Sequence, residues 1–163
     1  MENTAMQKNL DTIKNWVDAI NRNDVEAEMS YWQPDGEFTI VPIGVTFKGI
    51  DEIKAGGQKS ANMIGGQSAE GRKQITHISG GATWAVVEYE VQATIVGPVA
   101  FGELIVLSAG EQREVITHTC VVFLMKDSKL LCGSEYFDTT AVAEQLGLSH
   151  EMLSNIYKAL GRV

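Results

Sequence analysis

Apolar residues in the first part of the chain recur every three or four positions, the period of an amphipathic helix. Between residues 5 and 21 these positions are Met6, Leu10, Ile13, Trp16, Val17 and Ile20. Asp24 follows a polar break and can cap a second helix over residues 25–32. A third helix is predicted over residues 51–64, with Asp51 as its N-cap. Three helices therefore precede most of the predicted strands.

Strand patterns dominate the rest of the chain. Residues 37–41 and 45–48 are short extended segments that follow a turn containing Pro and Gly. Alternating apolar positions then predict strands over 73–79, 83–96, 101–108, 114–125 and 129–137. Residues 139–146 and 150–160 predict two short helices, and Ser149 caps the second. This order predicts an α+β fold with three N-terminal helices on one face of a mostly antiparallel sheet and short C-terminal helices.

The last predicted hairpin sets which side chains share a face. Its turn lies between Asp127 and Ser128, and uninterrupted pairing from there places Cys120 opposite Glu135. Side chains alternate across a strand. One face is then expected to carry His118, Cys120, Val122, Leu124, Glu135 and Phe137, and the other Thr119, Val121, Phe123 and Met125.

Both faces of the strand over residues 114–125 are apolar, so both are expected to be covered. Helices can cover only one of them. A second copy of the chain is the natural cover for the other, since large exposed apolar patches usually mark interaction surfaces. The sequence therefore predicts a homodimer joined through the sheet, and the alternative is a monomer with one face half-exposed.

Length and charge narrow the possible functions. The chain of 163 residues suits one domain spanning residues 1–163, and its formal net charge is −8. Nucleic-acid and membrane-surface binding both need clustered Lys and Arg, which this sequence lacks. No apolar stretch is long enough to span a bilayer, and the start has no secretory pattern. Two cysteines form no disulfide framework, so a cytoplasmic protein with free thiols is predicted.

Candidate chemistry centres on carboxyl groups. Glu135 is expected on an otherwise apolar face, where loss of solvent would suit it to proton transfer. His118 is its expected diagonal neighbour and can share a proton with it. Glu88 and Glu90 share one face of their strand, either facing solvent or lining the interior. The alternative for Glu135 is a strand-end carboxylate in water, and for His118 a hydrogen-bonded structural histidine. No metal motif is present, so no metal is predicted.

Aromatic side chains from the helices and the first strands are candidates for lining an apolar pocket. They are Trp16, Tyr31, Trp32, Phe38 and Phe47. The alternative is that they form ordinary core. In a cone-shaped fold the two roles overlap, because the inner end of the core is also the pocket wall.

Several segments resemble the NTF2-like (cystatin-like, SnoaL-like) superfamily of cone-shaped α+β proteins. They are Trp16-Val-Asp-Ala-Ile-Asn-Arg-Asn-Asp24, Tyr31-Trp-Gln-Pro-Asp-Gly-Glu-Phe-Thr39, Phe47-Lys-Gly-Ile-Asp-Glu-Ile53, Glu135-Tyr-Phe-Asp138 and Gln145-Leu-Gly-Leu148. The likeness covers nearly the whole chain and implies a curved sheet wrapped around the three helices. The superfamily includes cyclases, isomerases, epoxide hydrolases, dehydratases and carriers, so the fold alone does not assign chemistry.

Limonene-epoxide-hydrolase-like members resemble the chain at their two acids. The resemblance places one acid at Glu135 and the other at Glu90, with Glu88 where those members have arginine. Their water-holding Tyr and Asn correspond to Phe38 and Ile40. These matches retain the carboxylates and lose the groups that hold the water.

Two other groups of the superfamily give different matches. Ketosteroid-isomerase-like members place their general base at Ile40 and their oxyanion donors at Trp16 and Cys120. SnoaL-like polyketide cyclases use a carboxylate beside a histidine, a pattern that Glu135 and His118 suit best.

Two functions remain open from the sequence. The first is a cofactor-independent enzyme that acts on a small hydrophobic molecule in a closed pocket by isomerisation, cyclisation, dehydration or epoxide hydrolysis. Glu135 would be its acid/base, His118, Glu90 and Glu88 its partners, and Ile40, Cys120 and the aromatic residues would contact the substrate. The second is a non-catalytic protein that binds a small hydrophobic ligand in the same cone.

Overall fold

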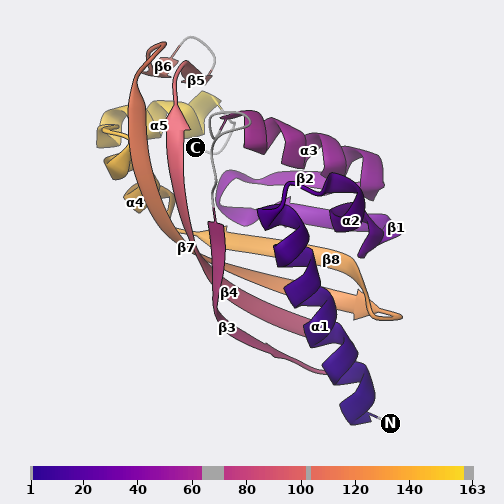
Figure 1. Ribbon diagram of the computed structural model, residues 1–163. Helices are drawn as coiled ribbons and strands as arrows, with labels where there is room; N and C mark the ends of the chain where they lie inside the picture. Colours follow the sequence, from indigo (N-terminus) through magenta and orange to yellow (C-terminus); the bar gives the residue numbers. More distant parts are fainter. Residues whose placement is uncertain (1, 64–71, 102–103, 160–163) are drawn as a thin grey trace.

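The computed structural model describes residues 2–63, 72–101 and 104–159 (Figure 1). The N-terminal helices are α1 (Glu2–Asn21), α2 (Val25–Ser30) and α3 (Gly49–Met63), and the C-terminal helices are α4 (Thr139–Gln145) and α5 (His150–Ala159). Asp24 caps α2 as predicted, because its carboxylate accepts from the Ala27 N–H at 3.1 Å. Helix α3 begins earlier than predicted, so Asp51 lies in its first turn and is not its cap.

Six strands form one sheet in the order β2-β1-β8-β7-β4-β3. They are β1 (Trp32–Ile40), β2 (Val45–Lys48), β3 (Arg72–Gly80), β4 (Trp84–Val96), β7 (Gln112–Lys126) and β8 (Lys129–Phe137). Only β1 and β8 run parallel; the other neighbours are antiparallel. The segment predicted as one strand over 101–108 contributes instead to a separate pair, β5 (Val99–Phe101) and β6 (Leu104–Leu107).

The sheet curves around the three N-terminal helices, which confirms the predicted cone-shaped α+β fold (Figure 1). We call the helix-covered side of the sheet its inner face and the opposite side its outer face. Apolar residues of α1 meet the inner-face residues of β4 and β7 in one buried cluster. At its centre, Phe123 contacts Trp16 and Trp32 edge to face, with ring centroids 5.2 Å and 6.1 Å apart.

A bulge in β8 changes the face on which Glu135 lies. The hairpin turns at Asp127 and Ser128 as predicted, both with positive φ, as a tight hairpin turn requires. The pairing then shifts between Leu124 and Met125, because β8 carries one extra residue there. Glu135 therefore pairs with Val121 on the inner face, and the predicted pairing with Cys120 is wrong.

The same bulge brings Gly133 to the inner face opposite Phe123. A Cβ atom at this position would lie 2.7 Å from the Phe38 ring and 2.8 Å from the Phe123 ring. Only glycine leaves room for both rings, so the bulge and this glycine together shape the narrow part of the core.

Side-chain amides bond two strand residues, Ile116 and Lys73, on the side where no described strand pairs with them. The Gln145 amide of α4 accepts from the Ile116 N–H at 2.8 Å and donates to the Ile116 carbonyl at 2.9 Å. The Asn21 amide of α1 bonds the backbone N–H and carbonyl of Lys73 in the same way, at 2.8 Å and 3.0 Å. Each amide satisfies two backbone groups that would otherwise need solvent.

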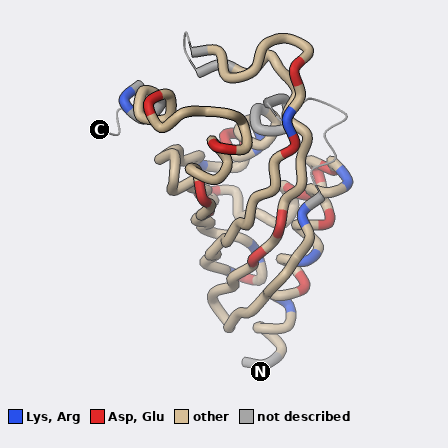
Figure 2. The backbone as a smooth tube through the Cα atoms, turned by 90° about the vertical axis from the view of Figure 1, so that its left-hand side faces the viewer, with Lys and Arg blue, Asp and Glu red and all other residues tan. Residues whose placement is uncertain are grey.

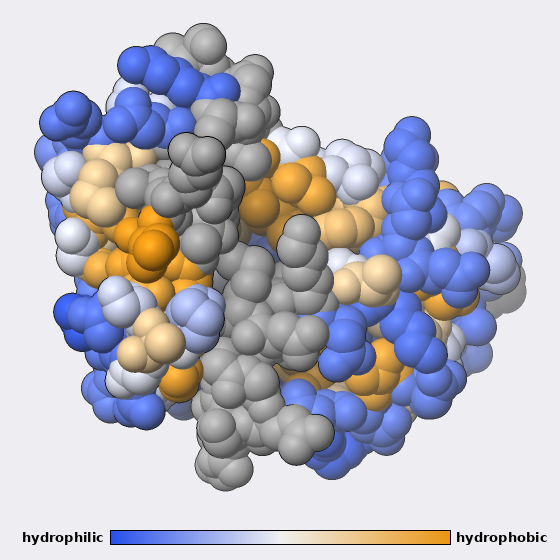
Figure 3. Space-filling model, turned by 90° about the horizontal axis from the view of Figure 1, so that it is seen from above, coloured by the Kyte–Doolittle hydropathy of each residue, from blue (hydrophilic) through white to orange (hydrophobic). Residues whose placement is uncertain are grey.

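The outer face is partly apolar and partly acidic. Its half-exposed large side chains are Trp84, Ile116, Val122, Leu124 and Tyr136. Acidic positions also lie along the strands in the middle of the molecule (Figure 2). Seen from above, further apolar side chains are exposed at the upper end (Figure 3). No helix within the described ranges is long and apolar enough to cross a membrane.

Candidate functional site

A polar cluster lies on the inner face among otherwise apolar residues. Tyr89 of β4 is fully buried, and its hydroxyl donates to Glu135 Oε1 of β8 at 3.0 Å. Lys73 Nζ of β3 donates to the same hydroxyl oxygen at 3.1 Å. The tyrosine hydroxyl thus links an ammonium group on one side to a carboxylate on the other.

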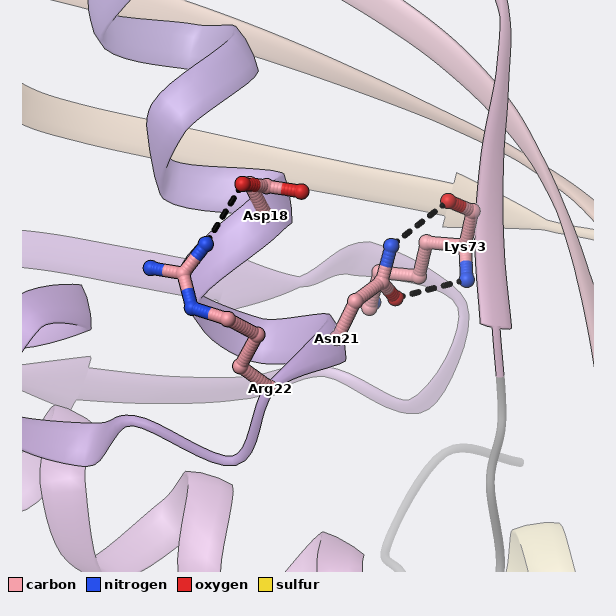
Figure 4. A network of polar contacts seen from close by, with 4 residues as sticks. All are labelled: Asp18, Asn21, Arg22 and Lys73. Atoms are coloured by element: carbon pink, nitrogen blue, oxygen red, sulfur yellow. Dashed lines mark hydrogen bonds and ion pairs between the residues drawn. The ribbon is translucent and has the colours of Figure 1, made fainter.

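Backbone contacts fix each member of this cluster in place. Glu135 lies between Ile40 on β1 and Val121 on β7 in the sheet. The Lys73 backbone is held at the start of β3 by two hydrogen bonds with the Asn21 amide, which accepts from the Lys73 N–H and donates to the Lys73 carbonyl (Figure 4). Its ammonium also lies 4.4 Å from the centroid of the Tyr89 ring, a cation–π geometry that favours this position.

The direction of the hydrogen bonds follows from the protonation of Tyr89. Burial, and then the negative charge of Glu135, raise the pKa of the Tyr89 hydroxyl well above its ordinary value. The hydroxyl therefore stays protonated at neutral pH. It donates its only proton to Glu135 and orients that carboxylate without itself being free to donate elsewhere.

Glu28 of α2 adds a second carboxyl group to the surroundings of Lys73. Burial raises the pKa of Glu28, and the positive charge of Lys73 lowers it by a smaller amount. The net effect raises the pKa of Glu28 above its ordinary value. A carboxyl group with a perturbed pKa near Lys73 is one feature that functional sites often show.

We expect Glu28→Gln to stabilise the protein at pH 7 more than at pH 4. In the wild type the unfolded chain releases the Glu28 proton near pH 4.5, whereas the folded chain holds it to higher pH. Stability is therefore lost as pH rises through this window, and glutamine removes that loss. Urea unfolding at both pH values measures it. Glu26→Gln is the control, since that side chain lies on the same helix and is 83% exposed; an equal effect there would contradict the prediction.

The predicted partners of Glu135 lie on the outer face instead. Glu90 Oε2 is 3.7 Å from His118 Nε2, and the His118 side chain is 79% exposed. Glu88 and Cys120 pair beside them. Burial and then the Glu88 charge raise the pKa of the Cys120 thiol. The backbone of β4 and β7 separates this group from Glu135, so the predicted contact between Glu135 and His118 is wrong.

This outer group borders a shallow hollow of about 300 Å³. Its lining includes Glu88, His118, Cys120 and Tyr136. Among the described residues, no three His, Cys, Asp or Glu side chains are arranged to hold a metal ion. Charges that open to solvent interact weakly, so the inner cluster offers the stronger setting for acid/base chemistry.

The predicted substrate-contacting residues divide between the core and the cluster. Trp16 and Trp32 are buried core residues, and Phe38 meets Trp32 edge to face at 5.8 Å. Phe47 borders a second hollow of about 280 Å³ next to Gly56. Ile40 is the only one that pairs directly with Glu135 in the sheet. Tyr31 is half-buried and packs against the core. A closed pocket around Glu135 stays a prediction.

Sequence reasoning missed Lys73, Tyr89 and Glu28. Tyr89 lies on the same apolar face of β4 as Ala85, Val87 and Val91. The hydroxyl of a tyrosine on an apolar face needs a hydrogen-bond partner. This requirement could have marked Tyr89 in the sequence as a member of a polar cluster. The other two residues come from distant segments whose approach only the fold reveals.

The curved sheet with helices on its inner face is an α+β fold of the ketosteroid-isomerase-like type, which solved structures share. The chain belongs to the SnoaL-like domain family, which matches residues 13–131. No curated protein matches the sequence.

Solved structures share the fold at low sequence identity. A candidate polyketide cyclase from Xanthomonas campestris pv. campestris has a TM-score of 0.72 at 16% identity, covering 87% of this chain and 98% of that one. A protein of ketosteroid isomerase-like fold from Catenulispora acidiphila has a TM-score of 0.67 at 15% identity, with coverage of 86% and 95%. An LEH-like epoxide hydrolase from M. tuberculosis has a TM-score of 0.65 at 14% identity, with coverage of 94% and 97%.

Proposed function

We propose that the protein is a cofactor-independent enzyme that converts a small, largely apolar molecule by carboxylate acid/base chemistry. The observation that carries this proposal is the placement of Glu135 on the inner face, with one oxygen held by the buried Tyr89 hydroxyl. A fixed carboxylate in apolar surroundings is suited to removing and returning a proton. Ile40 and Val121 beside it favour an apolar substrate.

The fold neighbours support this class of reaction. They include candidate polyketide cyclases and an epoxide hydrolase, and the reactions suggested for this chain are of isomerase, cyclase or epoxide-hydrolase type. All three reaction types use carboxylates to move protons. Glu135 supplies that group here, and Tyr89 keeps it oriented.

A non-catalytic ligand-binding protein is the second candidate. The apolar Phe38 and Ile40 favour it, because they stand where epoxide-hydrolase-like relatives hold water with polar groups. The two candidates differ in turnover. An enzyme converts its ligand at a rate that depends on Glu135, whereas a carrier binds it unchanged.

The test is a conversion screen with the purified protein. Apolar epoxides, ketones and β-hydroxyketones are incubated with wild type and with Glu135→Gln, and products are quantified by chromatography. The proposal expects at least one compound to be converted by the wild type and not by the variant. Tight binding of compounds that neither protein converts would support the carrier instead.

We also propose that a second copy of the chain covers the outer face. The strands β3, β4, β7 and β8 each have nine or more residues. At ordinary strand spacing and rise, strands of these lengths give a face of roughly 700 Å². This area is close to the roughly 800 Å² that each partner buries in a stable interface. The half-exposed apolar residues lie on this face, so a two-fold pairing would bury them together.

Leu124→Lys is expected to convert the wild-type dimer into a monomer. Leu124 is 54% exposed on the outer face, and a lysine there would bring a charge into the apolar contact. Sedimentation velocity at several protein concentrations measures the change. Ile105→Lys is the control, because Ile105 is 64% exposed on β6, outside the main sheet. A wild type that sediments as a monomer would refute the dimer.

The cellular location is proposed from the cysteines. Cys120 and Cys132 are both free and partly exposed. Free thiols persist where the environment is reducing. This supports the cytoplasmic location predicted from the sequence.

A further inference from the structure

We propose that two histidines of the outer face, His118 and His77, make the dimer pH-dependent, so that two copies associate more tightly near pH 6 than near pH 8. This inference rests on the proposed covering of the outer face by a second copy, and it names how that contact is regulated. It is carried by two glutamate–histidine pairs in adjacent positions of the sheet.

The two pairs are formed between neighbouring strands. Glu90 of β4 is the Cα partner of His118 of β7, and its Oε2 lies 3.7 Å from His118 Nε2. Glu88, two residues earlier on β4, is the Cα partner of His77 on β3. Ile78 packs against the core, so the adjacent His77 points to the outer face. Each copy therefore carries two carboxylates and two imidazoles close together on the outer face.

Further titratable groups lie on the elements next to His118. They are Glu88 of β4, Glu114 and Cys120 of β7, Tyr136 of β8, Asp138 at the N-cap of α4 and Glu144 of α4. Burial and then the Glu88 charge raise the pKa of the Cys120 thiol, so this thiol stays neutral. No Lys or Arg is a partner of Glu88 or Glu90 in the described strand pairings. Among these groups, a protonated histidine is the one that can balance the carboxylates.

The pairs lie between the apolar residues that the dimer would bury. On β7 the outer-face residues run in order from Ile116 through His118 and Cys120 to Val122 and Leu124, and the side chains at both ends of this row are half-exposed. A contact that covers Ile116 and Leu124 also covers His118, whose side chain is 79% exposed in the single chain. The dimer would therefore take the charged groups of both copies out of water together.

Loss of solvent makes the charge state of the pairs important. In the single chain the exposed pairs interact weakly with each other. In a covered contact an unpaired carboxylate is costly, and a positive charge beside it lowers that cost. A histidine in solution titrates near pH 6.5, and a neighbouring carboxylate favours its protonated form. Dimerisation therefore takes up protons, so association is tightest below about pH 6.5 and weakens as the pH rises toward 8.

The experiment is sedimentation equilibrium of the full chain near pH 6 and near pH 8. Salt is kept at about 0.15 M, which screens the repulsion between distant charges of the two copies. The dissociation constant Kd of the wild-type dimer is expected to be at least about 10-fold lower near pH 6. Each proton taken up on association can change Kd by up to about 10-fold per pH unit. Circular dichroism at both pH values verifies that each protein is folded.

Three variants separate protonation from packing. The double variant His77→Gln with His118→Gln is expected to raise Kd near pH 6 to the wild-type value near pH 8; a purely structural role would raise Kd equally at both pH values. The double variant Glu88→Gln with Glu90→Gln is expected to lower Kd near pH 8, because its neutral amides need no proton. His150→Gln is the matched control. It removes an exposed histidine at the start of α5, outside the sheet, and is expected to keep the wild-type pH dependence.

The outcomes distinguish pH control from the dimer itself. A wild-type dimer with the same Kd at both pH values would overturn this inference and leave the proposed dimer standing. The same holds if the histidine double variant keeps the wild-type pH dependence, or if His150→Gln abolishes it. A wild type that is monomeric at both pH values and at every concentration would refute the proposed dimer, and this inference with it.

Discussion

Glu135→Gln is expected to lower the rate of conversion by about 10²–10⁴-fold, the usual contribution of a general acid/base. Glutamine has nearly the same shape and its amide oxygen still accepts the Tyr89 hydrogen bond, but it cannot take a proton. The rate constant kcat for a compound converted in the screen is the measurement. KM is expected to change little, because the side-chain volume is preserved.

Glu90→Gln provides the matched control for this substitution. Glu90 is also a strand glutamate of the same sheet, but it lies on the outer face beside His118. Its variant is expected to keep the wild-type rate. If Glu90→Gln lost as much activity as Glu135→Gln, the site would lie on the outer face and the assignment of Glu135 would be wrong.

Phe123→Ala is expected to destabilise the fold by about 3–5 kcal/mol, the range for truncating a fully buried phenylalanine. Phe123 is 0% exposed, and its ring contacts those of Trp16 and Trp32. Its loss would leave a cavity that these rigid rings and the adjacent Gly133 cannot fill. The free energy of unfolding in urea, with the slope m compared between variants, measures the effect.

Ile105→Ala is the control for the core substitution. Ile105 is 64% exposed on β6, so its truncation is expected to change stability by no more than about 0.5 kcal/mol. A loss below about 1 kcal/mol for Phe123→Ala would contradict the face assignment of β7, since the side chain would then not be in the core.

Local patterns were sufficient to predict most of the elements. Helical periodicity located α1, and the side chains of Asp24 and Ser149 cap the following helices as expected. The hairpin turn could also be predicted, because Asp and Ser tolerate the positive φ found at Asp127 and Ser128 better than β-branched residues do. These features depend on neighbours in the sequence, which is why they could be predicted.

The face of Glu135 could not be predicted in this way. One extra residue in β8 reverses the alternation of every side chain that follows it. Register is specified by sequence when one face is apolar and the other polar. Here both faces of β7 carry apolar residues, so the pattern is compatible with either register. The error placed Glu135 beside His118 and on the wrong side of the sheet.

The cluster around Tyr89 depends on long-range contacts. Lys73, Tyr89 and Glu135 come from three strands, and β3 reaches β8 only across β4 and β7. Nothing in the local sequence of Lys73 distinguishes it from any lysine at the start of a strand. Its place beside Tyr89 depends on the sheet order and on the Asn21 contact, neither of which the local sequence contains.

The amide of Gln145 also bears on the solubility of the folded chain. The upper part of β7 extends beyond the end of β8, and this amide occupies the N–H and carbonyl of Ile116 there. An unprotected strand edge is a template for pairing with another chain. The Gln145 amide makes the two hydrogen bonds that a residue of a neighbouring strand would make, so these backbone groups are not available to another chain. Helix α4, which carries Gln145, therefore protects this strand edge against aggregation.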